Sequence, residues 1–446
     1  MSGPLTHPRP RNLSGRLCAV AALVALVALS GCATPLQGPL GDRIDAPLSK
    51  RWTAALPTDW EGWEVSTTTG CVLAFGWSAP SAPESTRRLE CHDPGTGELR
   101  WEHTRAVQGG FIQDRLFVEG DRIVLVNNQG AQALDADTGE VRWTFDPSDR
   151  VIADSVVKGG RVYLNLDRNV LCVLDLASGG WQRGIRVGGR RLLNVARTAE
   201  GEVALLLNEK KDGTRIASRT LVGIDVNGQG GETIEPPWAA MTSRWSQEIT
   251  TDGFVVEVID DVVVGTLSKG TLWGLDPSSG EVLYQESMSE QPAVRKPRSV
   301  KGARRTATPN ELQEIDRLLQ TTRLAPDTRL LPGGGQALLA QRSDVGLVMD
   351  MVHLERRDPR TLGTLWTLDL GWKEAALVKQ ELDELGVALL ANRKTLAIID
   401  LRTGEVLVER HLNGQGRRYQ GISTDGRAVY FVFGLKKKPR LEGHPL

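Results

Sequence analysis

Few residues in this sequence combine the types and spacing that catalysis or metal binding requires. No two of its histidines stand at a metal-ligand spacing, so each is expected to be a surface or turn residue. The pattern Asp135-x-Asp137-x-Gly139 has the acidic alternation of a calcium loop, but no glutamate closes a twelve-residue loop. G-x-S-x-G, H-E-x-x-H and Walker sequences are absent. The sequence therefore predicts no catalytic residue, no metal site and no cofactor. The histidines after residue 50 are His92, His103, His353, His411 and His444.

The N-terminus has the features of an export signal that ends in a reactive cysteine. Arg9, Arg11 and Arg16 come first, and an apolar run from Leu17 to Leu29 follows them. This run has the length of a signal-peptide core and is too short for a membrane span. It ends in Leu29-Ser30-Gly31-Cys32, which resembles the bacterial lipobox.

The lipobox resemblance implies that Cys32 is lipidated. It would carry a diacylglycerol thioether and an N-acyl chain, and several acyl chains hold a protein on a membrane where one is marginal. We therefore expect a signal peptide over residues 1–31 and a flexible tether over residues 32–50. Ala33 follows the cysteine where an Asp would resemble an inner-membrane retention signal. The expected location is thus the periplasmic face of the outer membrane.

The remaining cysteines bear on the redox compartment. Cys71 and Cys91 lie in two segments that fit neighbouring strands of one hairpin, centred near residue 81. Two interpretations are open, a disulfide between them or two buried thiols. Cys172 is the third cysteine after Cys32, and the spacings match no zinc pattern.

Composition describes a globular chain with balanced charge. The 446 residues include 54 Lys plus Arg and 55 Asp plus Glu, which excludes a generally basic nucleic-acid binder. There are 48 Gly, and 12 Trp against 7 Phe and 4 Tyr. This bias indicates many tight turns and a tryptophan that is reused at one structural position. Beyond the N-terminus no apolar run reaches 18 residues, so no internal membrane span is expected.

A turn motif recurs along the chain at intervals of 40 to 51 residues, with one interval of 82. It reads Asp-x-x-Thr/Ser-Gly-Glu, and an aromatic residue usually follows eight positions after the Asp. Weaker copies begin at Asp175 and Asp225. Such a period indicates a solenoid, a propeller or an array. The residues of the clearer copies are Asp93, Gly97, Trp101, Asp135, Gly139, Trp143, Asp276, Gly280, Asp358, Trp366, Asp400 and Gly404.

The chemistry of this motif favours an all-β propeller. An Asp side chain accepts hydrogen bonds from backbone N–H groups two or three residues on, and Gly allows the positive φ of a hairpin. Short β-rich runs such as Ile123-Val124-Leu125-Val126 flank the turns. Four strands per repeat fit a propeller blade. The repeated Trp would then lie on the outer strand and pack into the next blade.

The string Ala133-Leu134-Asp135-x-x-Thr138-Gly139-Glu140-x-x-Trp143 resembles the PQQ-type, or quinoprotein-like, β-propeller repeat. The resemblance implies one β-propeller domain over residues 51–435, with eight four-stranded blades, or seven as the alternative. The strand at Trp52 and the run Arg427 to Gly434 would complete one shared blade and remove free edges. Residues 436–446 are predicted to be a basic, solvated tail.

The interval of 82 residues predicts an insertion at about 288–325, with a short helix from Pro309 to Gln320. Before this helix lies an acid-free basic segment. Two interpretations are open, a solvated loop or a contact for an acidic partner or anionic lipid head groups. The basic residues are Arg295, Lys296, Arg298, Lys301, Arg304 and Arg305.

Lipobox and repeats together resemble the BamB family of lipoproteins, propellers of the outer-membrane β-barrel assembly machinery. The resemblance implies a monomeric, non-catalytic scaffold for protein–protein interaction in the envelope, held on the membrane by its lipid anchor. Two alternatives stay open, a PQQ- and calcium-dependent dehydrogenase and a ligand-binding propeller module. The dehydrogenases often have a vicinal Cys-Cys pair, which this sequence lacks. The repeat itself is shared by enzymes, assembly factors and sensors, so it predicts the fold more strongly than the function.

Overall fold

The structure is a computed structural model, and it describes most of the chain from residue 50 to residue 446. The ranges outside the description are 1–49, 59, 69, 79–83, 109–113, 213–214, 228–238, 250–253, 260, 268–270, 288–326, 331–337, 346–349, 370–375, 379–385, 392–394, 413–418 and 434–438. Cys32, the predicted helix and the six basic residues of the insertion thus lie outside the described residues. All regular elements of the described part are β-strands, and no helix there could span a membrane.

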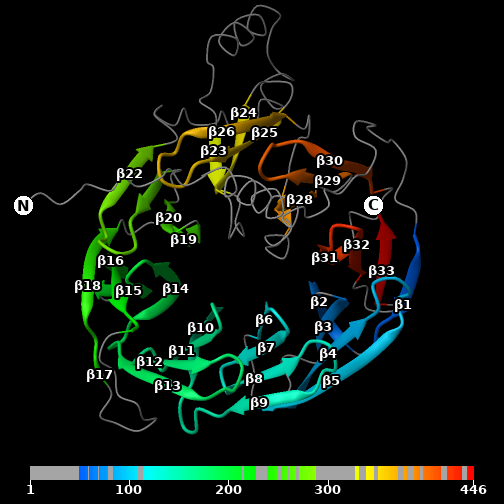
Figure 1. The fold of residues 1–446 in the computed structure, drawn as a ribbon, viewed down its shortest axis with the longest axis horizontal. Helices are drawn as coiled ribbons and strands as arrows, with labels where there is room; N and C mark the ends of the chain where they lie inside the picture. The colour runs from blue at the N-terminus through cyan, green and yellow to red at the C-terminus, as the bar shows by residue number, and fades with distance from the viewer. Residues whose placement is uncertain are drawn as a thin grey trace, which may run out of the picture. The chain divides into compact units, whose positions relative to one another are not determined.

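The strands form eight sheets, which are the blades of a β-propeller (Figure 1). This confirms the predicted fold class and the count of eight. In seven blades the sequence runs from the innermost strand outwards, and in the eighth the outermost strand comes from the N-terminal end of the described chain. Neighbouring strands pair antiparallel apart from one short addition. The first four blades are β2 (Trp60–Thr68), β3 (Cys71–Ser78), β4 (Glu84–His92) and β5 (Leu99–Gln108); β6 (Arg115–Glu119), β7 (Arg122–Asn127), β8 (Gly130–Asp135) and β9 (Val141–Phe145); β10 (Ile152–Lys158), β11 (Arg161–Leu166), β12 (Val170–Asp175) and β13 (Trp181–Arg186); and β14 (Arg191–Thr198), β15 (Gly201–Asp212), β16 (Arg215–Asp225) and β18 (Ser243–Ile249).

The other four blades continue the same order around the ring. They are β19 (Phe254–Ile259), β20 (Val262–Leu267), β21 (Thr271–Leu275) and β22 (Val282–Ser287); β23 (Asp327–Leu330), β24 (Leu338–Val345), β25 (Asp350–Arg357) and β26 (Thr364–Asp369); β27 (Ala376–Val378), β28 (Val387–Ala391), β29 (Thr395–Asp400) and β30 (Val406–His411); and β31 (Tyr419–Thr424), β32 (Ala428–Phe433), β33 (Arg440–Pro445) and β1 (Trp52–Ala55). The short addition is β17 (Ala239–Ala240), which pairs parallel with β13 at the outer edge of the third blade.

Apolar contacts between neighbouring blades form the core. Strand runs such as Val162–Leu166 are buried on both faces, because each sheet is covered by a blade on either side. Eight clusters of buried residues each join two successive blades, and one of them joins the eighth blade to the first. The blades therefore form a closed ring.

The repeated turn connects the third and fourth strands of a blade. At Asp135, the side-chain Oδ1 accepts hydrogen bonds from the backbone N–H groups of Asp137 and Thr138, each at 3.1 Å. The N–H of Gly139, at a φ of 71°, donates to the carbonyl of Asp135 at 2.9 Å. Equivalent bonds form at the copies that begin with Asp93, Asp175, Asp276, Asp358 and Asp400.

The repeated tryptophan joins each of five blades to the next one. Trp143 Nε1 donates to the carbonyl of Leu176 at 2.8 Å, and Leu176 directly follows the turn Asp of the next blade. Trp101 makes the same bond to Ala136 at 3.2 Å. The sequence predicts that this tryptophan lies on the outer strand and packs into the next blade, and the structure confirms it. The other three bonds are Trp52 to Pro94, Trp245 to Pro277 and Trp366 to Leu401.

The two ends of the described chain lie side by side in the eighth blade (Figure 1). Trp52 of β1 pairs with Gly443 of β33, so the predicted shared blade is present. The predicted tail over residues 436–446 is wrong, because residues 440–445 are the third strand of this blade and His444 is fully buried. Without β33, the first strand would have no partner between it and β32. Lys436, Lys437 and Lys438 lie outside the described residues.

Candidate functional site

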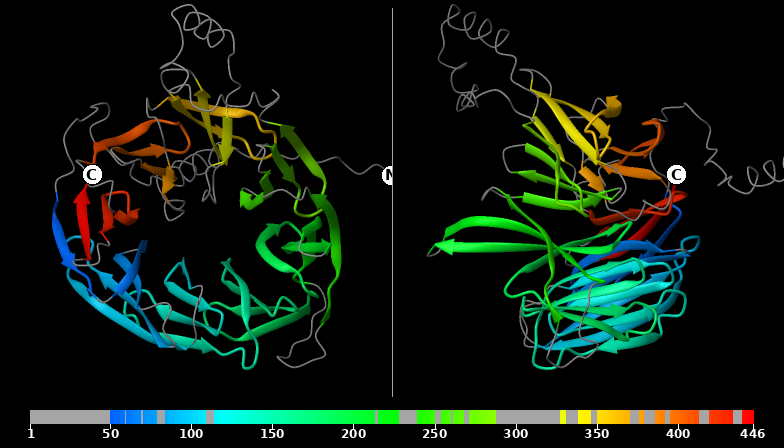
Figure 2. Two further views of the ribbon diagram at one scale, coloured as in Figure 1. Left: turned by 180° about the vertical axis from the view of Figure 1, so that it is seen from behind. Right: turned by 60° about the vertical axis from the view of Figure 1, so that its left-hand side comes forward.

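The connections between strands divide the propeller into two faces. The repeated Asp turns lie on one face, which we call the turn face. The hairpins between second and third strands, and the links from one blade to the next, lie on the opposite face, which we call the connection face. The hairpin of β15 and β16 is extended on the connection face and projects beyond the other strands (Figure 2).

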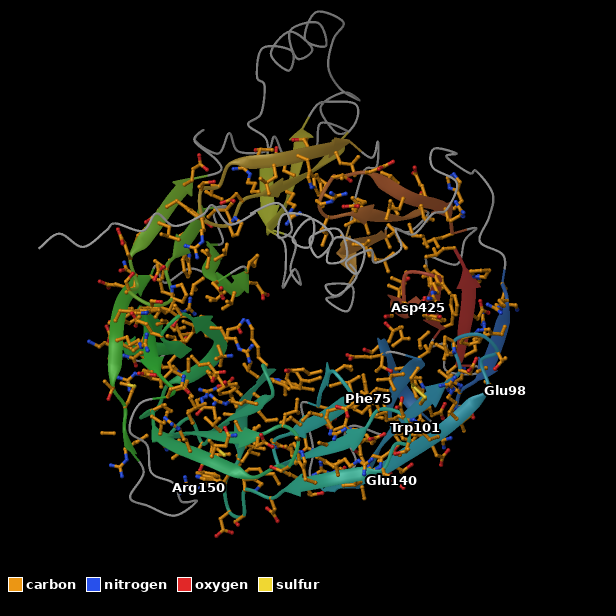
Figure 3. The ribbon with its side chains drawn as sticks, in the orientation of Figure 1. Phe75, Glu98, Trp101, Glu140, Arg150 and Asp425 are labelled. Carbon is orange, nitrogen blue, oxygen red and sulfur yellow. A yellow bond between two sulfur atoms is a disulfide. The ribbon has the colours of Figure 1, made fainter. Side chains whose placement is uncertain are left out.

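A cluster of charged and amide side chains lies on the connection face at the inner part of the first three blades. We call it the interblade polar cluster. Phe75, which borders it, lies closer to the ring centre than Trp101 on the outer strand of the same blade (Figure 3). The cluster consists of Arg87, Arg105, Asp114, Arg115, Asn127, Asn128, Asp154 and Ser155.

A buried ion pair joins the first blade to the second. Arg87 on β4 is 4% exposed, and its guanidinium contacts Asp114, which directly precedes β6. A second bond from Arg87 goes to Ser85. Burial raises the pKa of Asp114, and the hydrogen bond from Arg87 offsets part of that rise. Burial also lowers the pKa of the nearby Arg105. Charged groups that are desolvated in this way beside a cleft are typical of functional sites.

Hydrogen bonds extend the cluster from the second blade to the fourth. Arg115 Nη1 donates to the carbonyl and the hydroxyl of Ser155, at 3.2 and 3.3 Å. Asp154 Oδ2 accepts bonds from Asn165 Nδ2 and from the backbone N–H of Leu192, both at 3.2 Å. Asp154 and Asn165 are buried, so these bonds hold neighbouring blades at a fixed spacing.

A cavity of about 200 Å³ opens between the second and third blades within this cluster. Val126, Ile152 and Ala153 supply apolar surface, and the remaining lining is polar. Asn128 Oδ1 is buried and has no hydrogen-bond partner among the residues that the structure describes. A smaller cavity adjoins it beside Arg87 and Arg105. The arrangement offers both donors and acceptors to a bound group, which suits recognition.

The remaining candidate groups for chemistry are metal ligands and thiols. Within the ranges that the structure describes, no group of three His, Cys, Asp or Glu side chains is placed to hold a metal ion. Cys71 and Cys91 are joined by a disulfide across β3 and β4, and Cys172 is a buried thiol. Burial raises the pKa of that thiol.

Two histidines do not lie where the sequence placed them. His92 and His444 were expected at the surface or in turns, but they are 3% and 0% exposed. His92 Nε2 lies 2.8 Å from Glu90 Oε2, and His444 Nε2 lies 3.2 Å from Glu442 Oε2. Each carboxylate also forms an ion pair at Oε1 with an arginine, so the same three-residue arrangement occurs twice.

Two similar pentapeptides form this arrangement, and their similarity is visible in the sequence. Arg88-Leu89-Glu90-Cys91-His92 lies on β4 and Arg440-Leu441-Glu442-Gly443-His444 on β33, each the third strand of its blade. Comparison of the two pentapeptides would have identified residues 440–444 as a blade strand. The polar cluster has no comparable signal, since its members are far apart in the sequence.

The comparisons with known proteins agree with this fold. A family model described as outer membrane protein assembly factor BamB matches residues 49–286, just over half of the chain. No curated protein is significantly similar to the chain in sequence. Among solved structures, the computationally designed Ika8 protein is 12% identical, with a TM-score of 0.50, over 89% of this chain and 99% of its own.

Two natural proteins are also similar in structure. BamB from Moraxella catarrhalis is 13% identical, with a TM-score of 0.44, over 90% of this chain and 98% of its own. The quinohemoprotein alcohol dehydrogenase from Comamonas testosteroni is 13% identical, with a TM-score of 0.46, over 91% of this chain and 78% of its own.

Proposed function

Since the chain belongs to the family of the outer membrane protein assembly factor BamB, we propose that it is a non-catalytic scaffold of the bacterial cell envelope. It binds a protein partner through the connection face. The observation that carries this proposal is the interblade polar cluster, in which buried Arg87 pairs with partly buried Asp114 and Arg115 lines an open cavity. Such a preorganised polar surface recognises a partner at little cost in ordering its side chains.

Lipidation at Cys32 would hold this scaffold at the outer membrane. The basic signal, the apolar run and the lipobox-like Leu29-Ser30-Gly31-Cys32 support an anchor there. Mass spectrometry of the N-terminal peptide from the membrane fraction tests the anchor, and Cys32→Ala should give unprocessed, unlipidated protein. An unmodified Cys32 in the membrane-bound wild type would contradict it.

The non-catalytic role is supported by the lack of the vicinal Cys-Cys pair of many quinoprotein dehydrogenases. A dehydrogenase would bind PQQ with calcium and reduce an electron acceptor when an alcohol is supplied. Titration of the purified protein with PQQ and calcium, followed by its absorption spectrum, should show no saturable binding. Saturable binding together with alcohol-dependent dye reduction would favour the enzyme instead.

Partner binding is tested by quantitative co-purification from crosslinked membranes. Arg115→Gln shortens the side chain but keeps it polar, and it removes the charge that bridges the second and third blades. We expect the recovery of specific partners to fall at least about tenfold, since hydrogen bonds to charged groups contribute about 1.5–3 kcal/mol. Arg402→Gln, an exposed residue of the turn face, is the matched control. Equal recovery from both folded variants would overturn the role of the connection face.

A further inference from the structure

A second, larger cavity lies on the connection face at the outer rim, away from the interblade polar cluster. We call it the rim cavity, and its volume is about 580 Å³, within the usual range of small-ligand sites of about 300–1,000 Å³. Three segments line it, the link from β9 to β10, the hairpin between β11 and β12, and the end of β13. Figure 3 places Arg150, one of its lining residues, at the periphery of the ring.

Backbone hydrogen bonds fix the walls of the rim cavity. Val151 N–H donates to Asp167 Oδ1 at 2.9 Å, and Asp167 N–H donates to the carbonyl of Val151 at 2.8 Å. On the other side, Val187 N–H donates to the carbonyl of Asn169 at 2.7 Å. The three segments are therefore held together without a ligand, and the cavity is preformed.

Backbone conformations of uncommon type gather at this cavity. Of the five described non-glycine residues with positive φ, Ser148, Asp167 and Arg168 lie at its border, at 58°, 51° and 56°. Asp167 and Arg168 are the central residues of the turn that Asn169 N–H closes on the carbonyl of Leu166, at positions where positive φ favours Asn or Gly. Strained positions of this kind persist where the side chains serve a purpose, and they are frequent at ligand sites.

The described side chains of the rim cavity can form hydrogen bonds, and their formal charges sum to zero. The side chains of Asp149, Asn169 and Arg186 make no hydrogen bond or ion pair with any other residue that the structure describes. The carboxylates of Asp149 and Asp167 balance the guanidinium groups of Arg150 and Arg186. A bound anion or cation would therefore give the occupied cavity a net charge. The lining therefore fits a neutral ligand that both donates and accepts hydrogen bonds.

We propose that the rim cavity binds a neutral oligosaccharide. Adjacent hydroxyl groups of a sugar ring donate to a carboxylate such as Asp149 and accept from a guanidinium such as Arg186 at the same time. The amide of Asn169 offers both kinds of group. This site is separate from the partner-binding cluster and would let the scaffold contact envelope glycans.

The test is ligand-observed NMR and calorimetry with residues 50–446, which contain all eight blades. The probes are maltotriose, tri-N-acetylchitotriose and, as a peptide of similar size, tetraglycine. We expect millimolar or tighter binding of at least one of the two sugars. Arg186→Gln and Asn169→Ala should each weaken it at least about fivefold, because each removes hydrogen bonds to the ligand.

Arg402→Gln on the turn face is the matched control and should bind as the wild type does. Circular dichroism and thermal unfolding establish that each variant is folded, and Arg186 and Asn169 make no contacts whose loss would unfold the blade. The absence of sugar binding, sugar binding that both variants retain, or a preference for tetraglycine would each overturn the proposal.

Discussion

The indole of Trp52 lies against Gly97, so that a Cβ atom at Gly97 would be 2.4 Å from the Cε3 atom of Trp52. Trp52 belongs to the eighth blade and Gly97 to the repeated turn of the first. The same indole donates from Nε1 to the carbonyl of Pro94 at 3.0 Å. The turn glycine is thus required twice, by its φ of 76° and by the indole of the preceding blade. Trp101 with Gly139, and Trp143 with Gly179, repeat this contact.

Replacement of a turn glycine should cost more than its backbone conformation alone explains. Gly139→Ala places a methyl group where the Trp101 ring lies 2.6 Å away, which adds about 1–3 kcal/mol of overpacking to the backbone penalty. Gly120→Ala is the control, since its φ is also positive but nothing lies within 4 Å of the added Cβ. The free energy of unfolding of Gly120→Ala should fall by only about 1–2 kcal/mol, the cost of the backbone conformation. Urea unfolding measures both, and equal losses would mean that the indole contact is unimportant.

The last strand should be essential to ring closure. Deletion of residues 439–446 removes β33 and leaves β1 and β32 without the strand between them. We expect a large fall in the thermal midpoint and early proteolytic release of residues 50–56. Replacement of Lys436, Lys437 and Lys438 by Ser should leave the midpoint nearly unchanged. A deletion as stable as the wild type would restore the interpretation of this segment as a tail.

Stability should fall in acid partly through Glu442. Burial alone would raise its pKa, but hydrogen bonds from His444 and Arg440 outweigh burial and lower the pKa to about 2. Since its folded pKa is below the unfolded value of about 4.3, the carboxylate stabilises the fold above that pH. This contribution, roughly 2–3 kcal/mol, is lost as the pH falls from about 4.3 to 2.

The measurement is the free energy of unfolding between pH 6 and about pH 2 for wild type and Glu442→Gln. The variant should be less stable at pH 6 and should lose less stability in acid. Glu140→Gln is the control, because that side chain is 70% exposed and lies 3.8 Å from Arg142. If wild type and Glu442→Gln follow parallel curves, the buried pair does not supply this pH dependence.

The disulfide between Cys71 and Cys91 should be present in the exported protein. Thiol titration of denatured protein, processed at Cys32, is expected to find one free thiol, that of Cys172. Cys91→Ala should lower the free energy of unfolding by about 2–4 kcal/mol, because the unfolded chain gains conformational entropy when the crosslink is absent. Three free thiols in the wild type would show that the two buried cysteines are unpaired.

Local chemistry explains which parts of the fold the sequence predicts. Asp135 and Gly139 determine their turn by bonds within five residues, so the motif and its period reveal the blades. Trp245 occupies the equivalent tryptophan position in the fourth blade but follows Asp225 by 20 residues instead of eight. A motif with the aromatic residue eight positions after the Asp therefore does not include Trp245.

The candidate site depends on contacts that no local pattern encodes. Arg87 and Asp114 are 27 residues apart, and strand register within two blades brings them together. Arg115 and Ser155 meet across a blade boundary in the same way. Such pairs become visible when the fold is known, whereas the basic segment, for which the sequence leaves a solvated loop and a partner contact open, lies outside the described residues.

The most direct test of the scaffold account is photocrosslinking in living cells, with a photoreactive amino acid placed on each face in turn. Asn128 lines the interblade polar cluster on the connection face, and Glu140 is exposed at a turn on the opposite face. The account predicts that the residue at position 128 crosslinks to a defined envelope protein and that the residue at position 140 does not. Crosslinks from position 140 alone, or none from either position in lipid-anchored, folded protein, would contradict it.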